Sequence, residues 1–324
     1  MTFPRAFNNR LAFDFLGRYR AERAIDYYGP GAHSQKGDRS NYSRESSEFY
    51  FRAGWKPTLR HLLKDIKIIL DAVPRRRDGS YRLFASLAIK GELIGPFRYE
   101  GTRMDDPNDI VPHEDRRDLR GLYVFCAWLN HTDSRSINSR NTIVEENGIR
   151  FVRHFLLDFG AILGSDSDMP KDARFGHEYT LPDSGGKVLR SAASLGLYSP
   201  DWERAHFPKL KAVGHIESKV FDPDKWKPNY PNPAFLSCQP DDEYWAATQV
   251  MVFTNEDIRA IVETGEFSDP RVVDYLTATL AQRRDKIGKT YFSKVLPLDH
   301  FAVSEGELHF EDLAMKYNFT AARQ

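Results

Sequence analysis

Two acidic side chains and one amide lie close together in the sequence, on either side of a segment with the pattern of a β-hairpin. Asp133 and Asn138 are five residues apart in a polar stretch, and Asp158 follows the second strand-like segment. Mg²⁺ prefers oxygen ligands and keeps several waters, so one carboxylate and one amide are enough to hold it. A short loop would keep Asp133 beside Asn138, and a tight hairpin would return Asp158 to face both.

The segment between these residues is predicted to be a hairpin over residues 142–157. Its arms, TIVE and IRFVRHFLL, are rich in β-branched and aromatic residues. Asn147 and Gly148 lie between the arms. This pair tolerates positive φ angles and therefore favours a two-residue hairpin turn. The second arm delivers Asp158 at its end.

A buried helix is predicted to precede the polar stretch. Pro112, Glu114 and Asp115 suit its N-terminus, because proline has no N–H to leave unpaired and carboxylates oppose the helix dipole. The apolar stripe of this helix comprises Leu119, Leu122, Tyr123, Cys126, Ala127 and Leu129. The helix would therefore run directly into the stretch that holds Asp133.

The sequence beyond the hairpin predicts loops and helices. Residues 241–253 have the pattern of a buried helix, and Thr254 with Asp257 forms a capping-box signature for the next helix. A third helix is predicted from Ser268 as N-cap to Gly288 as C-cap.

The first part of the chain differs from the rest. Residues 1–50 contain much glycine, serine and charge with little to bury, so they are predicted to be irregular or mobile. A helix pattern covers residues 57–74, and a strand pattern covers residues 80–90. Gly91 and Gly95 follow as turn signals.

The composition is that of a globular protein of 324 residues, 41% of them hydrophobic. Lysine plus arginine equals aspartate plus glutamate at 46 each, so the global field steers neither nucleic acid nor an anionic membrane toward the chain. No apolar run reaches the length of a membrane span, and the first residues lack the apolar core of a secretory signal. With Met1 as the start, the cytoplasm is the default expectation.

The order of helix, polar stretch, hairpin and acid resembles the catalytic half of the protein kinase-like superfamily. HTDSRSIN keeps His131, Asp133 and Asn138 at the spacing of the kinase H-R-D-L-x-x-x-N loop, with Thr132 in place of arginine. LLDFG keeps the D-F-G triplet at residues 158–160. The threonine resembles the loops of atypical branches, such as HipA-type and phosphatidylinositol kinases, and of bacterial proteins with the same motifs.

The resemblance implies a role for each matched residue. Asp133 would position the hydroxyl that accepts a phosphoryl group, and Asn138 would serve the reaction as a metal ligand. Asp158 would hold metal and, with Phe159 and Gly160, would contribute to the nucleotide site. The implied cofactors are ATP and Mg²⁺. The implied partners are the nucleotide and a protein or small-molecule acceptor. The charge balance and hydropathy add the expectation of no nucleic acid and no membrane span.

The resemblance also implies a fold. The expected class is α+β, with a mainly helical C-terminal lobe, a catalytic-loop hairpin, and a reduced or divergent N-terminal lobe. The expected organisation has an irregular segment at 1–50, a partial N-terminal lobe and hinge at 51–112, and the helical lobe at 113–324.

Two alternatives stay open. The earlier part of the chain offers no convincing glycine-rich loop, and Lys90 is only 43 residues before Asp133, too close to be the lysine of a nucleotide clamp. A catalytically inactive kinase-like binding or scaffolding protein is therefore the alternative to an ATP- and Mg²⁺-dependent phosphotransferase. Asn141, eight residues after Asp133, is the alternative to Asn138 as metal ligand.

Overall fold

The structure is a computed structural model that describes residues 89–166, 169–181 and 199–320, with isolated positions between 67 and 81. The expectations for the irregular N-terminal segment, for the first helix and for most of the strand before Gly91 fall outside the described residues. Of the partial N-terminal lobe expected at 51–112, the structure describes residues 89–112 and the isolated positions between 67 and 81.

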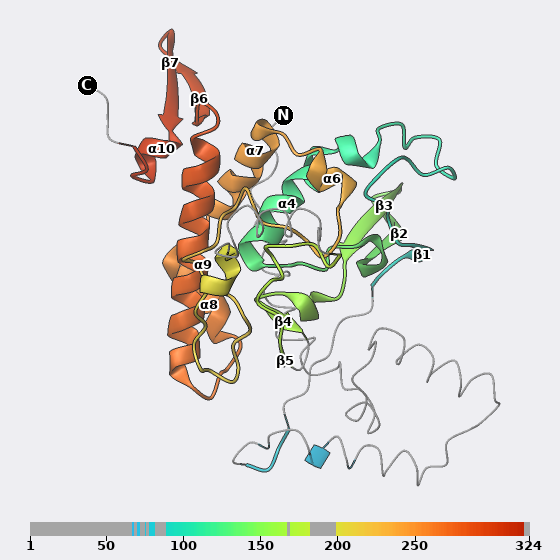
Figure 1. Cartoon of the computed structure of the whole chain (residues 1–324). Coiled ribbons are helices and arrows are strands. Elements are labelled where there is room, and N and C mark those ends of the chain that lie inside the picture. Colours follow the sequence, from blue (N-terminus) through green and yellow to red (C-terminus); the bar gives the residue numbers. More distant parts are fainter. Residues whose placement is uncertain are drawn as a thin grey trace, which may run out of the picture. The chain divides into compact units, whose positions relative to one another are not determined.

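The described part of the chain combines helices with small antiparallel sheets, which confirms the α+β class (Figure 1). The main helices are α4 (Arg117–Leu129), α7 (Pro240–Met251), α8 (Asn255–Glu263) and α9 (Pro270–Phe292). The strands are β1 (Glu92–Gly95), β2 (Ser139–Glu146), β3 (Ile149–Leu156), β4 (Ser165–Asp166), β5 (Met169–Pro170), β6 (Leu298–Ser304) and β7 (Glu307–Asp312). The short helices are η2 (His113–Asp115), η3 (Ser136–Asn138), η4 (Phe159–Ala161), η5 (Asp201–Arg204), α6 (Pro233–Leu236) and α10 (Leu313–Lys316).

The predicted hairpin is confirmed. Strands β2 and β3 pair antiparallel from Ser139↔Leu156 to Glu146↔Ile149. Asn147 and Gly148 form the turn with φ angles of 55° and 77°, the left-handed conformations that this pair was predicted to supply. The hairpin therefore starts at the polar stretch and returns the chain beside that stretch at residue 157.

The segment between the turn signals at Gly91 and Gly95 is a strand that the sequence did not indicate. It forms β1, which pairs antiparallel with β2 as the third strand of the sheet, with Leu93 opposite Thr142. Gly91 has a φ of 100°, and a Cβ there would lie 2.4 Å from the carbonyl oxygen of Ile143. Glycine is required at this point because the chain passes directly against the backbone of β2.

Helix α4 begins five residues later than the predicted start at Pro112. Residues 113–115 form only the short helix η2, and Arg116 is extended, with φ −82° and ψ 123°. The acidic residues Glu114 and Asp115 do lie in a helical turn, but extended Arg116 separates this turn from α4, which starts at Arg117.

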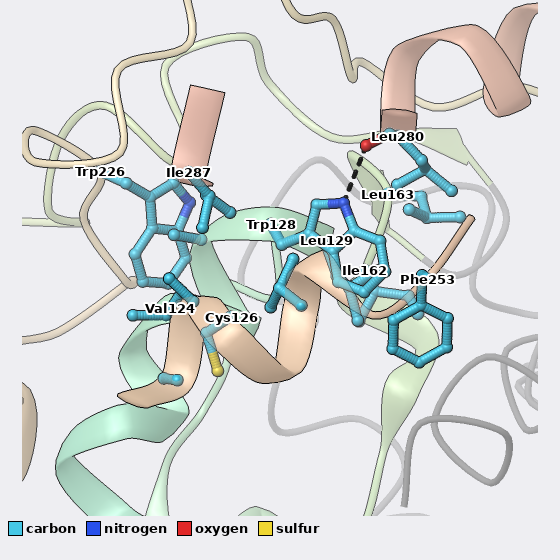
Figure 2. Close-up of a cluster of buried hydrophobic side chains, with 14 of the residues drawn as sticks. Val124, Cys126, Trp128, Leu129, Ile162, Leu163, Trp226, Phe253, Leu280 and Ile287 are labelled. Atoms are coloured by element: carbon cyan, nitrogen blue, oxygen red, sulfur yellow. Dashed lines mark hydrogen bonds between the residues drawn. The ribbon is translucent and has the colours of Figure 1, made fainter. Parts of the chain in front are cut away.

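A common core joins α4 to the helices that follow much later in the chain. Trp128 of α4 is 1% exposed, and its Nε1 donates to the Leu280 carbonyl oxygen of α9 at 2.9 Å (Figure 2). The core around it includes Val124, Cys126, Leu129, Ile162, Leu163, Phe253 and Ile287. The end of α4, where the polar stretch begins, is therefore held by buried apolar packing.

Helix α9 was predicted to end at Gly288, and this was wrong. The helix continues to Phe292, and its N-cap is Asp269, one residue after the predicted Ser268. A Cβ on Gly288 would lie 2.5 Å from Met251 Sδ and 2.7 Å from the Phe319 ring. Gly288 therefore allows close packing against the middle of the helix.

Helices α7 and α8 and the capping box of Thr254 are confirmed.

The helical lobe expected at 113–324 also contains a hairpin after α9, followed by the short helix α10. Strands β6 and β7 pair antiparallel beyond the end of α9 (Figure 1), with Glu305 and Gly306 at positive φ in the turn. One face carries exposed Val303 and Leu308, which pair in register.

Across the part of the chain that the structure covers, none of the helices combines the length and apolarity needed to cross a membrane.

Candidate functional site

The polar loop, residues 130–138, begins at a defined helix end. Asn130 caps α4 in the left-handed conformation, with a φ of 52°. The backbone N–H of His131 donates to the Cys126 carbonyl oxygen at 2.8 Å, which closes the last turn of the helix. Burial lowers the pKa of His131 to about 4, so its imidazole is neutral near neutral pH.

Asp133 and Asn138 are brought together by this loop. Asn138 Nδ2 donates to the Asp133 carbonyl oxygen at 2.8 Å and to Asp133 Oδ2 at 2.9 Å. The backbone N–H of Asn138 donates to the Arg135 carbonyl oxygen at 2.9 Å. The five-residue spacing in the sequence therefore corresponds to direct contact between the two side chains.

The Asp133 carboxylate is also paired with Arg135. Arg135 Nε donates to Asp133 Oδ1 at 2.6 Å, and Arg135 Nη2 donates to Oδ2 at 3.2 Å. Burial acts to raise the pKa of Asp133, but Arg135, Lys171 and the Asn138 amide lower it below its usual value. Asp133 is therefore a stable carboxylate that can attract a hydroxyl proton by hydrogen bonding.

Asp158 lies beside the polar loop in a strained backbone conformation. The neighbouring Leu157 N–H donates to the Asn138 carbonyl oxygen at 2.9 Å, one residue beyond the end of β3. Asp158 itself has φ 57° and ψ 71°. A left-handed residue other than glycine costs about 1–2 kcal/mol, and such strain concentrates at functional sites.

The rest of the D-F-G triplet is buried. Phe159 is 3% exposed, and its ring centroid lies 5.6 Å from that of His131. Gly160 is buried in η4, directly after Asp158. The loop and the triplet therefore contact each other through the rings of His131 and Phe159.

Two cationic side chains, Arg135 and Lys171, interact electrostatically with both Asp133 and Asp158. Burial acts to lower the pKa of Arg135, but Asp133 chiefly, with Tyr230 and Asp158, raises it. Burial lowers the pKa of Lys171, while Asp166, Asp133 and Asp158 oppose the shift. Asp133 and Asp158 thus both favour the charged forms of the same two side chains.

Asn141, the alternative metal ligand, is engaged within the hairpin. It is fully buried, and its Oδ1 lies 2.7 Å from His154 Nδ1, directly opposite in the register. Asn138 instead contacts Asp133 in the polar loop. These contacts favour Asn138 over Asn141, and the metal-binding role stays a prediction.

The two predicted metal ligands, Asn138 and Asp158, carry oxygen atoms of the kind that Mg²⁺ prefers. Over the described ranges, no three His, Cys, Asp or Glu side chains gather into a metal-binding group. Asn138 and Asp158 offer one amide and one carboxylate, a small oxygen set that suits a metal whose other ligands are water and phosphate. Zinc sites instead require three or four nitrogen, sulfur or carboxylate ligands.

Sequence reasoning missed two residues of the site. Arg135 lies inside the quoted polar stretch, and its two-residue separation from Asp133 was an available signal for an ion pair. Lys171 had no local signal, because its contact with Thr132 joins residues 39 positions apart.

A glycine after the triplet allows close passage of another segment. Gly164 has a φ of 67°, and a Cβ there would lie 2.1 Å from the His215 carbonyl oxygen. Gly148, in the hairpin turn, also has positive φ, but a Cβ there meets nothing within 4 Å. The two positions share backbone strain and differ in available space.

Replacing Gly164 with alanine is expected to lower the free energy of unfolding by about 2–4 kcal/mol, because strain and overpacking add. Gly148→Ala should cost only the strain, about 1 kcal/mol. Denaturant unfolding of both variants measures the difference. Equal losses would contradict the close packing of Gly164 against His215.

No family model, curated protein or solved structure matches this chain.

Proposed function

We propose that the chain is an ATP- and Mg²⁺-dependent phosphotransferase with a kinase-like catalytic lobe of the atypical type. The observation that carries the proposal is the junction between the polar loop and Asp158. A backbone hydrogen bond from Leu157 to Asn138 places the two predicted metal ligands on adjacent chain segments. Asp158 is held there in a left-handed conformation, and backbone strain of this kind concentrates at functional sites.

The orientation of Asn138 supports its role as a metal ligand. Its Nδ2 is occupied by two acceptors of Asp133, the carbonyl oxygen and Oδ2. An amide presents its oxygen on the side opposite to its nitrogen, so Oδ1 is the atom of Asn138 that is left for a cation. With the carboxylate of Asp158, this oxygen would hold Mg²⁺.

Asp133 would hold the acceptor hydroxyl in line for transfer. A carboxylate has about four lone-pair sites, so it can accept a further hydrogen bond besides those from Arg135 and Asn138. Its lowered pKa keeps it ionised. Phosphoryl transfer requires positioning and charge stabilisation more than covalent help, and bound Mg²⁺ supplies charge stabilisation at the phosphate oxygens.

The same contacts favour a second candidate, a kinase-like binding protein without transfer activity. Both carboxylate oxygens of Asp133 already accept hydrogen bonds from Arg135 or Asn138. If these bonds persist when nucleotide is bound, Asp133 would stabilise the loop and would not engage a hydroxyl.

Asp133→Asn distinguishes the two candidates. It should leave Mg²⁺-ATP affinity unchanged and lower the rate of phosphate transfer about 100-fold, because the hydrogen-bond acceptor for the hydroxyl is weakened. Glu145→Gln is the matched control, since Glu145 is exposed on the neighbouring strand β2. Calorimetry of Mg²⁺-ATP binding and transfer of labelled phosphate are the two measurements.

Equal transfer rates for wild type and Asp133→Asn would reject the catalytic role. Nucleotide binding without any transfer in the wild type would favour the binding protein.

A further inference from the structure

Lys171 is a nearly buried lysine in the segment after η4. It directly follows β5, and its backbone N–H donates to the Gly164 carbonyl oxygen at 2.9 Å. Only 7% of the residue is exposed. Its Nζ donates to Thr132 Oγ1 at 2.8 Å and lies 4.8 Å from the ring centroid of Phe175.

The charge of Lys171 is stabilised by the site. Burial of an ammonium group is costly unless opposite charges and hydrogen bonds compensate. Asp166, Asp133 and Asp158 provide the opposing charge, and Thr132 provides a hydrogen bond. An uncharged methionine would fill similar space without the desolvation cost, so the ammonium is present for its interactions.

Thr132 transmits this contact to the reacting part of the loop. It is 1% exposed and immediately precedes Asp133. Its carbonyl oxygen accepts a hydrogen bond from the Asn229 N–H at 2.7 Å, so its backbone is fixed as well as its side chain. A displacement of Thr132 would therefore move Asp133 with it.

We propose that Lys171 is a positioning residue that fastens the anchoring segment, residues 169–176, to the polar loop and keeps Asp133 and Asp158 in register. The inference rests on the proposed function and adds its mode of regulation. In kinases, the segment after D-F-G is commonly ordered by phosphorylation, through pairing of an arginine with the phosphorylated residue. Here the Lys171 ammonium of the anchoring segment donates directly to the Thr132 hydroxyl of the polar loop. Ordering of the segment therefore requires no phosphate.

Hydrogen exchange of the full chain tests the contact without any requirement for activity. Lys171→Met and Thr132→Val should each raise exchange in residues 131–138 and in the anchoring segment about tenfold, while α9 stays protected. The double variant should add little to either change, because the two residues act through one bond. Lys171→Arg should restore most of the protection, and exposed Lys211→Met is the control.

Unchanged loop exchange in either single variant would overturn the inference. If Lys171→Met loses protection throughout the chain, Thr132→Val decides the question, since it removes the same bond while Lys171 keeps its charge and the opposing charges of Asp166, Asp133 and Asp158.

The activity of the same variants tests the positioning role. Lys171→Met should lower kcat about tenfold and change KM for Mg²⁺-ATP less than about threefold, because misplacement of Asp133 affects the transition state more than binding. Wild-type protein treated with a phosphatase should keep its full transfer rate. Loss of activity after that treatment would overturn phosphate-independent ordering.

These outcomes separate the two proposals. If wild type and Asp158→Asn bind Mg²⁺-ATP equally and neither transfers phosphate, the proposed function fails. The exchange measurements still decide whether Lys171 fastens the loop.

Discussion

Asp158→Asn is expected to abolish Mg²⁺-dependent binding of ATP while the protein stays folded. Asparagine is nearly the same size and tolerates the left-handed conformation of residue 158, so the backbone strain is unchanged. The loss of one of two predicted metal ligands removes the charge that holds the ion. Calorimetric titration with Mg²⁺-ATP should show an affinity at least about 100-fold weaker.

The stability of the metal-free variant provides a second readout. Asp158 acts on the pKa of Lys171 and Arg135 through its negative charge, so its removal weakens a favourable interaction. The free energy of unfolding should therefore fall slightly, by less than about 1 kcal/mol. Wild-type affinity for Mg²⁺-ATP in Asp158→Asn would contradict the assignment of this residue.

Arg283→Met is expected to lower the free energy of unfolding by about 3–5 kcal/mol. The Arg283 guanidinium is buried and lies 3.5 Å from the ring centroid of Phe221. It donates to the carbonyl oxygens of Ala127, Trp128 and Glu217, at 2.5, 2.8 and 2.8 Å. Its loss would leave buried carbonyls without their donor.

These contacts link Arg283 to the site. Two of the carbonyls belong to the last turn of α4, just before the polar loop, where no further helical turn follows to supply donors. The Ala127 carbonyl oxygen also accepts the Asn130 N–H. Burial lowers the pKa of Arg283 to about 9, so the guanidinium is still protonated near neutral pH. A lysine cannot reach three carbonyls with planar geometry, so Arg283→Lys should recover little of the loss.

Arg271→Met is the matched control on the same helix. Arg271 is exposed and pairs with Asp269 at the start of α9, so its replacement should change the free energy of unfolding little. Guanidinium chloride unfolding measures all three variants. A loss below about 1 kcal/mol for Arg283→Met would show that the α4 end is held by apolar packing alone.

Local signals allowed the hairpin and several caps to be predicted. Asn147 and Gly148 adopt the positive φ angles that their residue types favour, whatever surrounds them. Thr254 and Asp257 satisfy each other across one helical turn, so the capping box is also a local feature. The contact between Asp133 and Asn138 follows from a loop of only five residues.

Features that depend on distant packing were not predictable from the sequence. Gly288 has the residue type of a helix end, but Met251 and Phe319 pack against it and the helix continues. Strand β1 exists because it pairs with β2, about 50 residues later. Lys171 has no local pattern, and only the fold brings it to Thr132.

A time course of terminal phosphate leaving labelled ATP, with water or the chain itself as acceptor, tests the central claim most directly. Wild-type protein should release or transfer the phosphate only when Mg²⁺ is present. Asp158→Asn should show no transfer above background, and Asp133→Asn should be about 100-fold slower than wild type. Equal rates in wild type and both variants, or transfer that continues without a divalent cation, would contradict the account.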